Sequence, residues 1–198
     1  IDNDCDGKID CSDSDCGPTR CVGGTQNNQL CATDATTLTC TQGGGVCQCP
    51  FIQKDPTTIT FRTTRHPLDR LKSHGRVTIL GSVDIMGSEV GWLLDNNSGK
   101  IYGVVLPAGS MTANLAGTSF KYKDLNAKTQ GGVYKAKIRI KGGTSYAYTV
   151  ETYGDMSRAT DPDMAIQFYM GALSTPAIHR EIWTRTIHGG WIAKGAEG

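Results

Sequence analysis

Apolar and polar residues alternate along most of the chain after residue 56, and a period of two is typical of half-buried β-strands. The clearest case is VYKAKIRIKG, which puts Tyr134, Ala136, Ile138 and Ile140 on one face and Lys135, Lys137, Arg139 and Lys141 on the other. The other segments of this kind are TTITFRTT, VTILGSVD, EVGWLLD, KIYGVVLP, GTSFKYKD, SYAYTVETYG, DMAIQFYMG and AIHREIWTRTI.

Turn-forming stretches such as DNNSGK, QGG, KGGT and ATDPD separate these segments. Short strands with turn signals between them, at a spacing of about ten residues, predict a mainly β fold. We expect residues 51–198 to form an immunoglobulin-like antiparallel β-sandwich, because the strands are too unequal to favour a closed barrel. A helical turn is expected only around Pro67–His74.

Residues 1–50 have a different composition, rich in Gly, Thr, Asn and Gln and poor in apolar residues. Such a segment cannot bury a core of its own, so covalent or metal crosslinks must order it. Prolines at 50 and 56 keep residues 49–56 extended, and we interpret these residues as a linker. The chain therefore divides into a small N-terminal module, 1–50, and a larger β domain, 51–198.

All eight cysteines lie in the N-terminal module: Cys5, Cys11, Cys16, Cys21, Cys31, Cys40, Cys47 and Cys49. An even number packed into fifty residues indicates a disulfide framework and an oxidising, extracellular location. Thiolate–zinc binding is the alternative. It is less favoured because the four histidines lie outside the module and no CxxC pair is present.

The first sixteen residues, IDNDCDGKIDCSDSDC, fit the register of the twelve-residue calcium loop. Counted from Asp2, carboxylates fall at positions 1, 3, 5, 9 and 12, a glycine at position 6 and Lys8 at position 7. Lys8 would offer its backbone carbonyl, and the ion would cancel the repulsion between the aspartates. The predicted calcium ligands are Asp2, Asp4, Asp6, Lys8, Asp10 and Asp13. The alternative is a solvated acidic tail.

DNDCDGKIDCSDSDC resembles the thrombospondin type-3-like repeats and the related DNDCDG metal-binding repeats of secreted bacterial proteins. The resemblance covers about sixteen residues and implies calcium at the same positions. The stretches VVLPAGSM, GTSFKYKD, GGVYKAKIRIKG and GGWIAKG are similar to a C-terminal domain of uncharacterised secreted bacterial proteins. That similarity implies a β-sandwich and supplies no catalytic residues.

Charge divides the chain at the same boundary. Residues 1–50 hold seven acidic and two basic residues, a net charge of −5, whereas residues 51–198 hold 18 basic and 12 acidic residues, a net of +6. The face formed by Lys135, Lys137, Arg139 and Lys141, with Lys121 and Lys123 as further candidates, could bind an anionic partner, either an acidic polysaccharide or the acidic module of another copy. Nucleic acid is not expected outside the cell, and a lysine-lined sheet can also serve solubility alone.

Other candidate sites are weaker. Tyr146, Tyr148, Trp92, Trp183 and Trp191 could form a sugar-binding platform, although such residues more often complete a core. His179, Glu181 and His188 could bind a metal, but their spacing matches no zinc motif and we expect exposed strand residues. The chain has no GxSxG, HExxH or P-loop motif and no apolar run long enough for a membrane span. We therefore expect no enzyme and no catalytic residues.

Together these features predict a secreted, non-enzymatic structural protein, a calcium-stabilised subunit of a self-assembling fibre or pilus. Copies would join by strand addition, with TTITFRTT as an isolated strand that pairs with the sheet of the next copy. The homo-oligomer would be a filament, because a head-to-tail contact that does not close into a ring propagates. The alternative function is a secreted carbohydrate-binding or adhesion module.

Overall fold

The computed structural model describes residues 20–22, 46–48, 51–54, 56–62, 67–78, 83–171 and 177–193. The described chain is mainly β, with antiparallel pairing at all but one of its strand contacts, which confirms the predicted mainly β class. The one helix among the described residues is the single turn α2 (Ala127–Gln130). No helix of the described residues is long and apolar enough to cross a membrane.

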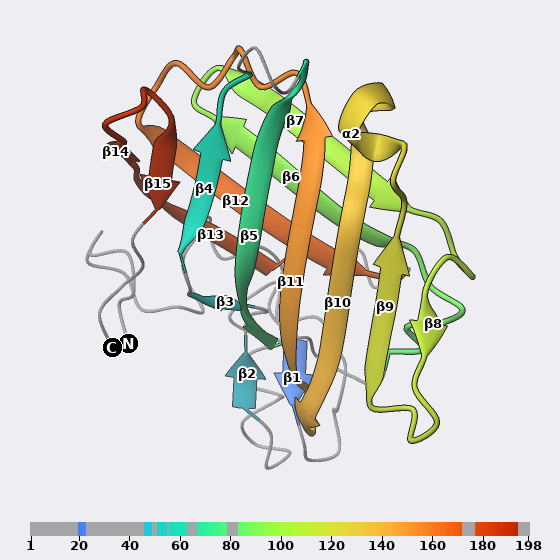
Figure 1. Cartoon of the computed structure of the whole chain (residues 1–198). Coiled ribbons are helices and arrows are strands. Elements are labelled where there is room, and N and C mark those ends of the chain that lie inside the picture. The colour runs from blue at the N-terminus through green and yellow to red at the C-terminus, as the bar shows by residue number, and fades with distance from the viewer. Residues whose placement is uncertain are drawn as a thin grey trace.

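Most strands belong to two layers that cross at an angle (Figure 1). The front layer contains β4 (Thr57–Thr60), β5 (Asp69–Thr78), β8 (Thr112–Ala113), β9 (Ser119–Lys123), β10 (Gly132–Gly142), β11 (Ser145–Gly154), β14 (Thr184–Arg185) and β15 (Trp191–Ala193). The back layer contains β6 (Val90–Asn96), β7 (Gly99–Leu106), β12 (Asp163–Met170) and β13 (Ala177–Ile182).

The short strand β3 (Phe51–Lys54) connects the two layers. It pairs antiparallel with the end of β5 and parallel with β13 at one residue pair, so the strand order runs β7-β6-β12-β13-β3-β5-β11-β10-β9-β8. β1 (Arg20–Val22) and β2 (Val46–Gln48) form a separate two-stranded antiparallel sheet.

Two clusters of buried apolar side chains fill the space between the layers. In the larger cluster, Tyr148 of β11 stacks on Phe168 of β12 with ring centroids 5.0 Å apart, and Phe168 also contacts Trp92 of β6. The smaller cluster includes Leu71 of β5 and Leu94 of β6. Each layer therefore has an apolar inner face, as the alternating sequence pattern requires.

The helical turn expected around Pro67–His74 is wrong, because β5 covers most of this stretch as a regular strand. Its inward positions include Asp69, Ser73 and Gly75 as well as Leu71 and Val77. Polar and small residues on the inner face obscured the period of two in the sequence. The buried polar side chains of β5 are satisfied: for example, the Ser73 hydroxyl lies 2.8 Å from that of Thr57 and 3.1 Å from the Tyr148 hydroxyl.

The isolated strand expected at TTITFRTT is also wrong. β4 pairs with β5 on one edge, where Ile59 lies opposite Leu71, and with β15 on the other, where Ile59 lies opposite Trp191. The Ile59 side chain is buried in the smaller cluster, as its place in the sequence pattern predicted. Both edges of β4 are occupied, so this strand is not available to pair with another copy.

Two bulges interrupt the predicted alternation in β10. The register with β11 shifts between Val133 and Lys135, so Val133 is buried in the core while Tyr134 is half-buried and contacts Tyr153 edge-on. It shifts again between Ile140 and Gly142, and Ile140 is exposed. The prediction that Tyr134 and Ile140 share the buried face of Ala136 and Ile138 is therefore wrong at both ends and right in the middle.

Candidate functional site

Basic side chains gather on the outer face of the front layer, the face turned to the viewer in Figure 1. The registers of β5, β11, β10 and β9 align them in rows across the sheet. Lys72, Glu151, Lys135 and Lys123 form one row, His74, Thr149, Lys137 and Lys121 the next, and Arg76, Ala147, Arg139 and Ser119 the third. We call Arg70, Lys72, Arg76, Lys121, Lys123, Lys135, Lys137 and Arg139 the basic face.

These residues point outward because their neighbours in sequence point inward. Leu71, Val77, Phe120, Ala136 and Ile138 are buried in the core and alternate with the basic residues of the same strands. The candidate face predicted from β10 is therefore one part of a larger surface.

A hollow of about 670 Å³ lies on this surface over β9, β10 and β11. It is lined by four lysines, three hydroxyl residues, one tyrosine and one alanine: Lys121, Lys123, Lys135, Lys137, Ser110, Thr112, Thr149, Tyr122 and Ala136. We call it the lysine groove. It presents ammonium groups and hydroxyls together, which suits a ligand with several anionic groups and further polar groups.

Glu151 is the carboxylate that ion-pairs with the basic face among the described residues. Its Oε2 lies 2.9 Å from Nζ of Lys135 and its Oε1 lies 3.9 Å from Nη1 of Arg70, while the Tyr153 hydroxyl donates to Oε1 at 3.1 Å. Burial alone would raise the pKa of Glu151, but these hydrogen bonds and positive charges outweigh it and lower the pKa. Both carboxylate oxygens of Glu151 are thus engaged by Lys135, Arg70 and Tyr153, and the group remains ionised at neutral pH.

Lys137 occupies the centre of the cationic rows. Partial desolvation, together with the positive charges of Arg139 and Lys121, lowers the pKa of Lys137. The positive charges of Lys137, Arg139 and Lys121 repel one another, and the row that contains Lys137 and Lys121 holds no carboxylate to compensate them. An anion placed between them would relieve this repulsion.

Lys141, the fourth basic residue predicted for this face, lies at the second bulge of β10 rather than in the regular rows. Conversely, Arg70, Lys72 and Arg76 of β5 were not predicted as part of the face. Their signal was present in the sequence, because DRLKSHGRVT places basic residues or histidine at every second position. Recognising it required reading that stretch as a strand.

The aromatic residues considered as a sugar platform belong to the core. Trp92, Trp183, Trp191, Tyr146 and Tyr148 are all at most 4% exposed. The indole N–H groups of Trp183 and Trp191 donate to the backbone carbonyls of Met164 and Ala159. These five rings therefore cannot stack on a ligand from solvent, and the core interpretation is the correct one.

His179 and Glu181 are not exposed strand residues as expected. They pair in register with the buried residues Ile166 and Met164, so both lie on the inward side of β13 and are only partly accessible. Nε2 of His179 lies 3.8 Å from Oε2 of Glu181. His188 is exposed in the turn between β14 and β15.

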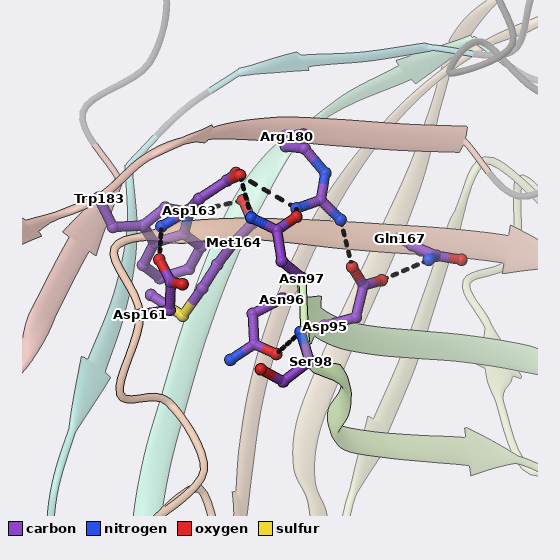
Figure 2. A network of polar contacts seen from close by, with 10 residues as sticks. All are labelled: Asp95, Asn96, Asn97, Ser98, Asp161, Asp163, Met164, Gln167, Arg180 and Trp183. Carbon is purple, nitrogen blue, oxygen red and sulfur yellow. Dashed lines mark hydrogen bonds and ion pairs between the residues drawn. The ribbon is translucent and has the colours of Figure 1, made fainter.

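A polar network on the outer side of the back layer fastens three strands together (Figure 2). Arg180 of β13 donates to Asp95 of β6 at 2.7 Å, and to Asp163 at the start of β12 at 3.2 Å. Asn97 accepts from Arg180 and donates to Asp163, and Gln167 donates to Asp95. Because the guanidinium and both carboxylates are engaged with one another, the arrangement serves to hold the strands.

The predicted calcium ligands Asp2, Asp4, Asp6, Lys8, Asp10 and Asp13 lie outside the described residues, as do Cys5, Cys11, Cys16, Cys31, Cys40 and Cys49. Cys21 and Cys47 are described as backbone only, in β1 and β2. Within the described part of the chain, no group of three or more His, Cys, Asp or Glu side chains is arranged to hold a metal ion.

Comparison with known proteins found no matching family model, no matching curated protein and no matching solved structure.

Proposed function

We propose that this protein is a non-enzymatic extracellular structural protein, a calcium-stabilised subunit of a self-assembling fibre or pilus. The proposal takes the N-terminal module as a disulfide-linked calcium site and the remainder as an immunoglobulin-like sandwich. Copies associate by strand addition, in which a strand of one copy extends the sheet of the next.

The observation that carries the proposal is the open edge of β7. This eight-residue strand ends the strand order and pairs only with β6 among the described residues. The register of β7 with β6 shifts at a bulge between the pairs Tyr102–Leu94 and Lys100–Asp95. The regularly paired stretch of β7 is therefore Tyr102–Leu106. Val105 in this stretch is 45% exposed. An unpaired edge of this length is a template for another strand unless something covers it.

The opposite end of the order is much less suitable, because β8 has two residues. Among the described strands with an open edge, β7 is the longest, since β13 has six residues and pairs with β3 at one residue pair on its second side. Pairing of β7 with β7 of another copy would close a symmetric dimer, whereas pairing with a different segment would propagate into a filament. The proposal requires the second case.

A lysine on the acceptor edge should block assembly, since charged residues on edge strands oppose strand addition. We expect Val105→Lys to abolish fibres seen by electron microscopy while leaving the thermal unfolding temperature nearly unchanged. Leu115→Lys is the matched control, because Leu115 is a fully exposed apolar residue in the β8–β9 hairpin. Fibres of Val105→Lys equal to those of the control would contradict the role of β7.

A further inference from the structure

We propose that the lysine groove binds an anionic polysaccharide, whose carboxylate or sulfate groups are held by Lys121, Lys123 and Lys137. This site is separate from the β7 edge and does not depend on fibre formation.

Three of the four lysines that line the groove have no acidic ion-pair partner among the described residues. Within the described residues, Glu151 is the carboxylate that pairs with the basic face, and it is already held by Lys135, Arg70 and Tyr153. No ion pair within 4.0 Å joins Lys121, Lys123 or Lys137 to any described acidic residue. Three clustered ammonium groups therefore remain for a ligand.

The groove lysines are spaced so that they can contact separate anionic groups of one ligand. Lys121 lies opposite Lys137, and Lys123 lies opposite Lys135, on adjacent strands that are about 4.8 Å apart. Along each strand the two lysines are two residues apart, roughly 7 Å. The four side chains thus start from the corners of a small quadrilateral. Lys121, Lys123 and Lys137, at three of these corners, can contact several anionic groups of one chain rather than a single compact ion.

The composition and size of the groove also suit such a ligand. Its volume of about 670 Å³ lies within the range of ligand-binding clefts, roughly 300–1,000 Å³. Ser110 and Thr149 add hydroxyls that can donate to or accept from sugar hydroxyls, and the Thr112 hydroxyl, which donates to the Lys121 carbonyl, can accept from them. Arg139 and the β5 cations continue the positive surface beyond the groove, as a polymer would require.

The acidic N-terminal segment of another copy is the competing occupant. Five of its six aspartates are the proposed calcium ligands, so their carboxylate oxygens would be directed at the ion and not at the lysines of another copy. A polysaccharide that carries an anionic group on successive sugars has no such competing partner. The groove chemistry therefore favours the polysaccharide.

The test measures binding of the full chain, in calcium, to polygalacturonate, dextran sulfate and neutral dextran, and to a labelled synthetic peptide of residues 1–16. The groove variant is Lys121→Gln with Lys137→Gln. The control variant is Lys100→Gln with Arg158→Gln, which removes two exposed positive charges outside the basic face. Thermal unfolding and electron microscopy of each variant report folding and fibre formation separately.

We expect saturable binding to polygalacturonate or dextran sulfate but not to dextran. The groove variant should bind roughly tenfold more weakly, as expected when two partly desolvated ion pairs are lost, and the control should bind like the native chain. Equal weakening of both variants, or no polysaccharide binding, would overturn the proposal. Binding of the peptide alone would overturn it too, and would assign the groove to contact between copies. If the native chain forms no fibres, the proposed function fails, but the proposal for the lysine groove is not affected.

Discussion

Glu151 shows how one buried acid organises a surface of opposite charge. Its carboxylate is only 8% exposed and meets Lys135, Arg70 and the Tyr153 hydroxyl at the edge of the cationic rows. The hydroxyl and the ammonium satisfy both oxygens, so the charge is not left uncompensated in a partly dry environment. It thereby holds Lys135 at the end of the lysine groove.

The lowered pKa of Glu151 makes stability depend on pH. Because the folded-state pKa lies below the ordinary value of 4.5, the stabilisation is present above about pH 4.5 and is lost as the pH falls through the folded-state pKa. Glu151→Gln should lower the free energy of unfolding by about 1–2 kcal/mol at pH 7, from the lost charged hydrogen bonds.

Urea unfolding between pH 7 and pH 3 checks this expectation. The difference between the native chain and Glu151→Gln should shrink toward the acid end of the series. Glu89→Gln, which changes an exposed carboxylate, should differ from the native chain by less than about 0.5 kcal/mol throughout. A Glu151→Gln deficit that stays constant with pH would show that the effect is not electrostatic.

At the scale of elements, the start of β5 is fastened by Asp69. Its side chain is buried and accepts from the backbone N–H groups of Arg62 and Met156, each at 2.7 Å. One carboxylate thus joins β5 to the segment after β4 and to the segment after β11. The same residue made β5 hard to predict as a strand, since an acid at an inward position breaks the apolar alternation.

Asp69→Ala would leave both N–H groups without this acceptor. We expect it to lower the free energy of unfolding by about 2–4 kcal/mol, because each buried unsatisfied donor costs about 1–3 kcal/mol. Asp124→Ala is the control, since that carboxylate accepts one exposed backbone N–H in a turn. Chemical unfolding measures both variants. A loss for Asp69→Ala no larger than that of the control would contradict the fastening role.

The existence of most strands was predictable, whereas their local irregularities were not. β6, β7, β9, β11 and β12 coincide with predicted segments because each is a short apolar or alternating run bounded by turn residues. The bulges of β10 and the inward polar residues of β5 depend on partners far away in the sequence. The lysine groove arises only when β9, β10 and β11 lie side by side. The sequence could therefore predict the lysines of β9 and β10 but not the cavity.

At the scale of the whole molecule, charge is distributed unevenly. The net of +6 over residues 51–198 is concentrated on the outer face of one layer, while the N-terminal module carries −5. The edge of β7 belongs to the other layer. The described domain therefore has an open strand edge in one layer and a cationic face on the other.

The central claim is that the chain assembles and that calcium is needed for it. The most direct test is electron microscopy with light scattering on the purified full chain, in calcium and after addition of a chelator. We predict filaments in calcium that are lost with the chelator, because removing the ion restores repulsion among the N-terminal aspartates. A chain that stays monomeric at high concentration in calcium, with no fibres, would contradict the account.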